Sequence, residues 1–244
     1  MKIKGDGDRL TAGGGKVAAK YALVVTRDPE EVAAAQRLRR DLLTVQYGMA
    51  LPTEVDGLDR DEFDELCTHL IVRENASGDV VATCRVFPPG VRERTYSSKR
   101  FDLSALREIR PAMLELSRVG VRADHRDGGV VAMLATAVFR LAREMDCTWI
   151  AGVPFVSLED GGVTAASIEK MIIAEHLAPA RLRVTPLQPW QSDGIETHGE
   201  AEIPQPLRHY LRIGAMVCGA PSHDTVLGVA DFFVLLDTRG RWQR

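Results

Sequence analysis

The segment from Met113 to Met145 constrains the fold more than any other part of the chain. It begins with the apolar run MLELSRVGV, residues 113–121, which predicts a buried β-strand. A polar turn then leads to Gly128 and Gly129, and the following residues are rich in Val, Ala, Met and Leu, as expected of a helix. A strand that passes through a glycine turn into a helix predicts a mixed α/β domain.

Segments on both sides extend this pattern. Asp28, followed by Pro29 and two glutamates, is typical of a helix start, because Asp caps the first turn and acids favour the positive end of the helix dipole. Turn residues at 74–79 between two apolar runs predict a β-hairpin. We expect helices at 28–46, 129–145, 164–176 and 204–218, and strands at 21–26, 69–73, 80–87, 113–121, 149–156, 183–187 and 232–236.

The remaining sequence indicates one folded domain over residues 21–244. No repeat and no long linker divides this range. Residues 1–20 contain three consecutive glycines and lack the apolar core of a signal peptide, so we expect them to form a flexible arm.

Composition excludes several classes of function. The chain has 244 residues, and its 31 basic and 34 acidic side chains give a net charge of −3, which argues against a strongly basic nucleic-acid binder. No apolar run approaches the roughly 18 to 20 residues that span a bilayer, so we expect a cytoplasmic protein, with peripheral membrane contact left open. The four cysteines are widely spaced, which indicates buried thiols and neither a disulfide framework nor a zinc site.

The turn between the strand and the helix at 113–145 has the residues of a phosphate site. The first N–H groups of a helix lack partners within it and lie at the positive end of its dipole. Glycines let an anion approach that backbone, and Arg122 and Arg126 can add charge-assisted bonds. The alternative is an ordinary strand-to-helix turn with both arginines in solvent. Neither GxxxxGK[ST] nor GxGxxG occurs in the chain.

The strand at 113–121 also carries two charges, Glu115 and Arg118, that are costly to bury unless they are paired. Regular alternation puts Glu115 and Ser117 on one face and Arg118 on the other, unless a β-bulge at Val119-Gly120 changes the phase. One interpretation is a polar cluster in which chemistry occurs. The alternative is two separate ion pairs, Arg118 with Asp64 and Glu115 with Arg85.

The segment Val121-x-x-Asp124-His125-Arg126-x-x-Gly129 resembles the cofactor-binding segment of the GNAT acyltransferases, whose pattern is Arg or Gln-x-x-Gly-x-Gly or Ala. Here Val131 stands at the last position of that pattern. Within the superfamily, Arg85 and Glu115-x-Ser-Arg118 are similar to the acyl-homoserine-lactone synthases. The wider sequence resembles the N-acyltransferases that make ornithine lipids and other N-acyl amino acids, over the segments 33–39, 64–70, 101–103, 115–126, 210–219 and 228–232.

This resemblance implies a GNAT-like fold with a mixed central sheet flanked by helices. It also implies transfer of a fatty acyl group from a thioester to the amine of an amino acid such as ornithine, by direct attack. The donor is an acyl carrier protein, with acyl-CoA as the alternative, and no cofactor is bound permanently. The phosphopantetheine of the donor is expected on Val119, Val121, Arg122, Arg126, Asp127, Gly128, Gly129, Val130 and Val131.

Roles for the other candidate residues follow from the same resemblance. Glu115 is the candidate base for the attacking amine, within a catalytic set completed by Ser117 and Arg118. The acceptor is expected on Asp64, Arg85 and Arg39, because Arg forks match carboxylates and Asp suits a cation. His125 is interpreted as a surface histidine. A basic set either docks an acidic carrier protein or lies solvated: Arg92, Arg94, Lys99, Arg100, Arg122, Arg140 and Arg143.

Three alternatives remain at this point. One is a short-chain acyltransferase that uses acetyl-CoA. Another is a lactone synthase that uses S-adenosylmethionine. The third is a non-catalytic module that binds a thioester without turnover.

Overall fold

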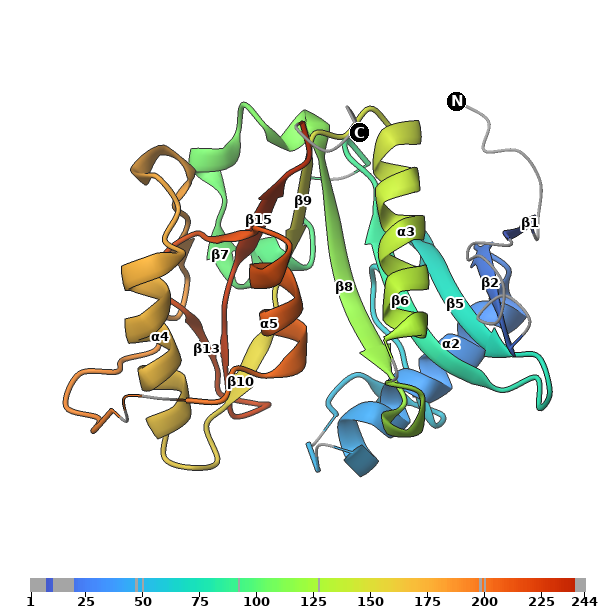
Figure 1. Ribbon diagram of the computed structural model, residues 1–244, viewed down its shortest axis with the longest axis horizontal. Coiled ribbons are helices and arrows are strands. Elements are labelled where there is room, and N and C mark those ends of the chain that lie inside the picture. The colour runs from blue at the N-terminus through green and yellow to red at the C-terminus, as the bar shows by residue number, and fades with distance from the viewer. Residues whose placement is uncertain are drawn as a thin grey trace. The chain divides into compact units, whose positions relative to one another are not determined.

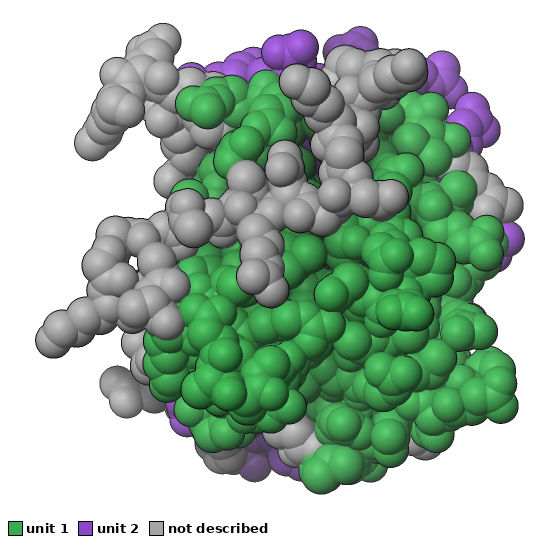
Figure 2. Space-filling view, turned by 90° about the vertical axis from the view of Figure 1, so that its right-hand side faces the viewer, with its two compact units in different colours: residues 1–91, 116–145 green, residues 92–115, 146–244 purple. Residues whose placement is uncertain are grey.

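The computed structural model describes residues 8–10, 20–46, 48–49, 51–91, 93–126, 128–197, 199 and 201–239. The chain forms two compact units, which Figure 2 distinguishes by colour. Unit 1 comprises Met1–Val91 and Leu116–Met145, and unit 2 comprises Arg92–Glu115 and Asp146–Arg244. Strand β8 (Met113–Val121) therefore contributes residues to both units.

Unit 1 is built on a sheet with the strand order β1-β2-β5-β6-β8. The pairs β1·β2, β2·β5 and β5·β6 are antiparallel, and the turn that joins β5 to β6 makes the predicted hairpin. A two-stranded ribbon, β3·β4, accompanies the sheet. The strands are β1 (Asp8–Leu10), β2 (Tyr21–Thr26), β3 (Glu54–Val55), β4 (Leu58–Asp59), β5 (Thr68–Glu74) and β6 (Val80–Phe87).

Helices α2 (Pro29–Asp41) and α3 (Gly129–Glu144) cover the two faces of this sheet. Val24 and Ile71 are register partners that pack with Ala35 of α2. Tyr21 points to the opposite face, where it contacts the segment that precedes α3, and Figure 1 shows α3 in front of the strands. The alternation of side chains along β2 thus supplies one apolar face to each helix.

Unit 2 contains the start of β8 and three sets of antiparallel strands. β15 pairs with β9 and β12, β14 pairs with β10 and β13, and β7 pairs with β11. Its core includes Phe101, Leu106, Leu182 and Phe233. The elements are β7 (Phe101–Asp102), β9 (Trp149–Gly152), β10 (Phe155–Ser157), α4 (Val163–Glu175), β11 (Thr185–Pro186), α5 (Gln205–Arg212), β12 (Met216–Val217), β13 (Ser222–Asp224), β14 (Val229–Asp231) and β15 (Val234–Asp237).

Short helical turns connect several of these elements. A π-helical turn, Leu42–Gln46, continues α2. The 3₁₀ turns are Asp64–Leu66, Ser97–Lys99, Ser104–Leu106, Arg110–Ala112, Ala123–His125 and Ala180–Leu182.

The predicted α/β class is confirmed, as are the strands at 21–26 and 113–121, the hairpin, and the helix from Gly129. The predicted helix at 204–218 was too long, because α5 ends at Arg212 and Gly214 adopts a left-handed φ of 83° before β12. The predicted strand at 149–156 is two strands separated by residues 153–154, since Pro154 has no N–H for a ladder.

Some predictions about the domain organisation stay predictions. Of the expected arm at 1–20, the structure describes Lys20 and residues 8–10, which form β1, and the rest lies outside the described residues. That residues 21–244 fold as one domain is likewise untested. Within the described part of the chain, no helix combines the length and apolar character needed to cross a membrane.

The N-cap of α2 provides a test of local stability. Both Glu30 N–H and Glu31 N–H donate to Asp28 Oδ1, at 3.0 and 3.1 Å. We expect Asp28→Ala to lower the free energy of unfolding by about 1 kcal/mol, because two helix N–H groups lose their acceptor. Asp28→Ser, which keeps an acceptor, should lose much less. Urea denaturation measures both, and equal losses would contradict the cap assignment.

Candidate functional site

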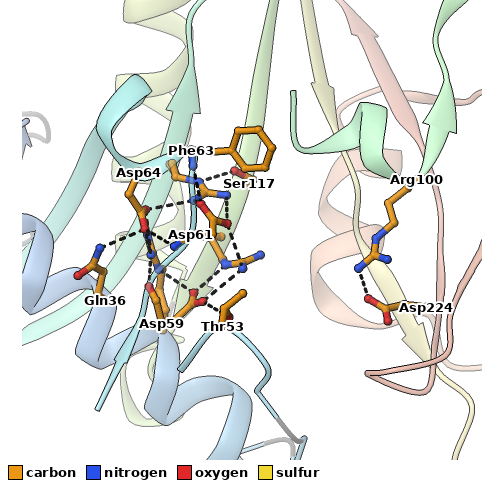
Figure 3. A network of polar contacts seen from close by, with 12 residues as sticks. Gln36, Thr53, Asp59, Asp61, Phe63, Asp64, Arg100, Ser117 and Asp224 are labelled. Carbon is orange, nitrogen blue, oxygen red and sulfur yellow. Dashed lines mark hydrogen bonds and ion pairs between the residues drawn. The ribbon is translucent and has the colours of Figure 1, made fainter. Parts of the chain in front are cut away.

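A buried network of alternating charge occupies unit 1, with three guanidinium groups and three carboxylates (Figure 3). We call it the charge cluster. Its side chains come from α2, from β4 and the segment that follows it, from β6 and from β8. Its members are Arg39, Asp59, Asp61, Asp64, Arg85 and Arg118.

Arg39 of α2 joins two of the carboxylates. Its Nε donates to Asp59 Oδ2 at 2.9 Å, and its Nη2 donates to Asp64 Oδ1 at 2.9 Å. Both Arg39 and Asp59 are buried, with side-chain exposures of 2% and 0%. Because a buried guanidinium is costly without carboxylate partners, these contacts fix the ribbon β3·β4 beneath α2.

Arg85 of β6 is fully enclosed by protein partners. Its Nη1 donates to Asp61 Oδ1 at 2.5 Å and to Asp64 Oδ1 at 3.1 Å, and its Nη2 donates to Asp61 Oδ2 at 3.0 Å. Its Nε donates to Ser117 Oγ at 2.9 Å. Its side chain is 0% exposed. The guanidinium fork is therefore directed at protein carboxylates, which makes Arg85 an organising residue of the charge cluster.

Arg118 of β8 completes the network from a left-handed backbone conformation, with φ of 52°. Its Nε donates to Asp59 Oδ2 at 2.7 Å, and its Nη2 lies 3.4 Å from Asp61 Oδ2. The positive φ interrupts the strand alternation, so neighbouring Ser117 and Arg118 both serve the same cluster. We predicted such an irregularity at Val119-Gly120, and the left-handed residue is Arg118.

The arginines keep the carboxylates of the cluster ionised. Burial alone would raise the pKa of Asp59, but Arg118 and Arg39 outweigh burial, and the net pKa lies below the ordinary value. The pKa values of Asp61 and Asp64 are lowered in the same way, against the effect of burial, by Arg85 for Asp61 and by Arg39 and Arg85 for Asp64. The cluster thus places three positive and three negative side chains in buried surroundings, with no net charge.

Several neutral side chains support the cluster. Gln36 Nε2 donates to Asp64 Oδ2 at 3.1 Å, and Thr53 Oγ1 donates to Asp59 Oδ1 at 2.6 Å. His69 Nε2 is 3.0 Å from the Asp64 carbonyl oxygen, and burial lowers the pKa of His69 to about 4, so its ring is neutral near pH 7. These residues and the carboxylates of Asp59 and Asp61 were not among the predicted site residues, because the charge cluster joins residues that lie far apart in the sequence.

The expected phosphate loop lies between β8 and α3. Arg126 Nε donates to the Val121 carbonyl oxygen at 3.1 Å, which closes the loop on itself. Gly128 is the N-cap of α3 with φ of 88°, and it makes no side-chain cap hydrogen bond. Val130 is buried, so its side chain is not accessible to a ligand. Asp127 lies outside the described residues.

Two residues near this loop differ from expectation. Arg122 Nε donates to Asp124 Oδ1 at 2.8 Å, and this hydrogen bond raises the pKa of Arg122. His125 was interpreted as a surface histidine, which is wrong: it is 5% exposed, with Nδ1 2.8 Å from Tyr21 Oη and Nε2 2.6 Å from Arg122 Nη2. No local pattern around His125 predicts this burial, because Tyr21 is 104 positions away.

Glu115, the predicted base, lies in unit 2 and is 2% exposed. Its Oε1 accepts from Ser97 N–H at 2.9 Å, and its Oε2 accepts from Ser97 Oγ–H at 2.6 Å. Both carboxylate oxygens therefore hold the turn Ser97–Lys99, and each retains capacity for another hydrogen.

The basic residues proposed to dock a partner separate into two groups. Arg94, Lys99 and Arg143 are exposed, and Arg140 pairs with Glu144 on the surface of α3 at 2.7 Å. Arg100 instead pairs with the buried Asp224 and Asp231 of unit 2, the first of which Figure 3 shows. Arg92 lies outside the described residues.

All four cysteines are buried, and burial raises the pKa of three thiols: Cys84 and Cys218 to about 12, and Cys147 to about 11. Such thiols are protonated near pH 7, and the thiolate is the nucleophile in cysteine chemistry. Across the described ranges, no group of His, Cys, Asp or Glu has the arrangement of a metal site.

The chain is similar to acyltransferases in sequence and fold. Residues 38–136 match the model of the acetyltransferase (GNAT) domain. The L-ornithine N(alpha)-acyltransferase of Rhodobacter capsulatus is 28% identical over 240 residues, which cover 90% of each chain. The GNAT match contains the whole charge cluster and the loop that leads to α3.

Solved structures confirm the predicted GNAT-like fold. An N-acyl amino acid synthase from uncultured soil microbes superimposes with a TM-score of 0.55 at 13% identity, covering 91% of this chain and 93% of the other. A CoA-dependent acyl-homoserine lactone synthase, solved with SAM and isopentyl-CoA, gives 0.52 at 17% identity, covering 86% and 79%. The sequence resemblance and the fold therefore lead to the same group of proteins.

Removing Arg85 tests whether the charge cluster is a unit of stability. We expect Arg85→Met to lower the free energy of unfolding by about 3 to 5 kcal/mol, because three buried carboxylates are then left with two guanidinium partners and one negative charge is uncompensated. The matched control is Arg140→Met on the surface of α3, where we expect less than about 1 kcal/mol. Urea unfolding measures both, and a loss for Arg85→Met no larger than for the control would contradict the assignment.

Proposed function

We propose that this chain transfers a fatty acyl group to the amine of an amino acid such as ornithine, because its sequence is similar to the acetyltransferase (GNAT) domain and to the L-ornithine N(alpha)-acyltransferases. The proposal rests chiefly on one observation. The region that matches the GNAT domain contains the buried charge cluster, and one of its arginines, Arg118, lies on the strand that leads into the glycine-capped start of α3. The donor of the acyl group is a phosphopantetheine thioester.

The loop between β8 and α3 is the proposed site of the donor phosphate. The cap residue Gly128 contributes no side chain, so an anion can approach the positive end of α3 closely. Arg126 stands next to this position and supplies charge. We propose acyl carrier protein as the natural form of the donor. Exposed basic residues such as Arg94, Lys99 and Arg143 suit an acidic carrier.

The charge cluster is the proposed source of acceptor recognition, with a division of roles among its arginines. Arg118 retains 13% side-chain exposure, whereas Arg85 has 0% and Arg39 has 2%. We therefore assign the contact with the acceptor carboxylate to Arg118. Arg85 and Arg39, together with Asp64, hold Arg118 and its partners in place.

The proposed reaction is a direct transfer. The acceptor nitrogen attacks the thioester carbonyl carbon, the carbon–sulfur bond breaks, and the products are an amide and the thiol of the donor. An attacking amine must be neutral and must lose a proton during the reaction, and we propose Glu115 as the proton acceptor. The backbone N–H groups of residues 119–121 are the proposed donors to the oxyanion. Protonated, buried thiols argue for this route and against an acyl-cysteine intermediate.

A panel of donors and acceptors tests the function. Purified protein would be given carrier-protein and CoA thioesters of acetyl to C18 acyl groups, each with ornithine, lysine, glycine and S-adenosylmethionine. We expect N-acyl ornithine from long-chain carrier-protein donors, detected by mass spectrometry. Acetylated product alone would favour a short-chain acyltransferase, and lactone product a lactone synthase. Absence of any amide with every donor would overturn the proposal.

The role of Glu115 is tested by Glu115→Gln. We expect kcat to fall by at least about 100-fold with the KM values little changed, since the proton acceptor is lost. Ser97→Ala is the matched variant, because it removes one partner of Glu115 but leaves its carboxylate, and it should cost less than about 10-fold. Comparable losses in both variants would show that Glu115 serves to hold the turn Ser97–Lys99.

A further inference from the structure

We infer that Tyr21 and His125 form a buried positioning pair that fixes the donor loop, residues 121–126, in the conformation that receives the acyl donor. The inference rests on the proposed function, because it assigns the donor phosphate to the end of this loop. Tyr21 lies on β2 and His125 on the turn Ala123–His125, so the pair ties the loop to the sheet of unit 1.

The contact is close and shielded from solvent. Tyr21 Oη and His125 Nδ1 are 2.8 Å apart, and the rings meet edge to face with centroids 5.6 Å apart. Tyr21 is 3% exposed and His125 is 5% exposed. A hydrogen bond this buried contributes direction as well as energy, since water has little access to either partner to replace the bond if it opened.

The partners of His125 determine its tautomer. Arg122 Nη2 lies 2.6 Å from His125 Nε2, and a guanidinium has only donors, so Nε2 must present a lone pair. A neutral imidazole carries its one proton on the other nitrogen. Nδ1–H therefore donates to Tyr21 Oη, and His125 accepts from the neighbouring arginine while donating to the tyrosine.

Charged groups surround the pair, and two carboxylates hold Arg122 in place. Arg122 also contacts Asp124 at 2.8 Å and Asp79 at 3.5 Å. Asp124 Oδ2 is 3.4 Å from His125 Nε2. On the other side, Lys20 Nζ lies 5.0 Å from the centre of the Tyr21 ring. Arg122 is thus held by its neighbours in the orientation that binds the histidine, so it acts on the donor through the loop conformation.

The position of His125 in the chain links this contact to the donor. It directly precedes Arg126, whose Nε binds the Val121 carbonyl oxygen, and Arg126 leads to the cap of α3. A loop fixed in advance loses less conformational entropy when its ligand binds. Loosening the pair should therefore weaken capture of the donor and leave the chemical step unchanged, because neither residue touches the reacting atoms.

Three variants separate the two bonds of the histidine. His125→Asn places an amide donor near the Nδ1 position and loses the bond to Arg122. His125→Gln places an amide near the Nε2 position and loses the bond to Tyr21, as Tyr21→Phe does by removing one oxygen. His176→Asn, at the end of α4 in unit 2, is the control.

We expect Tyr21→Phe and His125→Gln each to raise KM for the acyl donor by about 2- to 10-fold, the effect of one hydrogen bond, with kcat and the acceptor KM unchanged. The double variant should be no worse than His125→Gln alone, because both changes break the same bond. His125→Asn should show a smaller rise if the bond to Tyr21 dominates. The control should match wild type.

Hydrogen exchange of peptides covering 121–126 tests the same pair without any substrate. Faster exchange in Tyr21→Phe and His125→Gln than in His176→Asn supports the inference, even if the wild-type protein acylates nothing and the proposed function fails. An active wild type with unchanged donor KM and unchanged exchange in both variants overturns the inference and leaves the proposed function standing. Variants with lower thermal stability but wild-type donor KM and exchange overturn it as well.

Discussion

The burial of three arginines with three aspartates is the constraint on which unit 1 depends. A guanidinium or a carboxylate inside a protein is stable only when its partners are in place, so removing any one of the six leaves an uncompensated charge. Arg39, Arg85 and Arg118 come from α2, β6 and β8. Each of them contacts two carboxylates, which means that no two of these elements can shift independently. The charge balance, rather than apolar packing alone, sets the register among them.

The left-handed conformation of Arg118 follows from the need to pair every buried charge of the cluster. In a regular strand, neighbouring side chains point to opposite faces, so only one of Ser117 and Arg118 could reach the cluster. Here Ser117 binds Arg85 and Arg118 binds Asp59. Sparse backbone conformations of this kind persist where the surroundings determine them, and here the carboxylates do so. Because the donor loop begins three residues after Arg118, the geometry of the cluster also fixes where that loop starts. The proposed acceptor site and the proposed donor loop thus lie on, and directly after, a single strand.

Sequence reasoning succeeded where the physics is local. The Asp28 cap, the hairpin turn and the glycine that opens α3 are determined within a few residues, and all appear as predicted. It failed where burial depends on contacts between residues that lie far apart in the sequence. Asp59 and Asp61 were not predicted as site residues, since the sequence around them does not indicate that Arg39, Arg85 and Arg118 enclose them. His125 was predicted to lie on the surface because Tyr21, which contacts it in the fold, is far away in the sequence. The predicted end of α5 was also too late in the chain, because Gly214 adopts a left-handed backbone conformation after the helix.

Exposure distinguishes arginines that the sequence makes look alike. Arg85 and Arg118 both matched a substrate-binding role by type and spacing, but a guanidinium enclosed by protein carboxylates has its fork committed to them. Arg122 is more exposed, but its bonds to Asp124 and His125 direct it at the loop itself. A residue chosen to bind an anion must combine charge with access. By that criterion Arg118, partly exposed at the edge of a rigid network, suits the acceptor carboxylate, whereas the enclosed arginines supply the rigidity that makes its position reproducible.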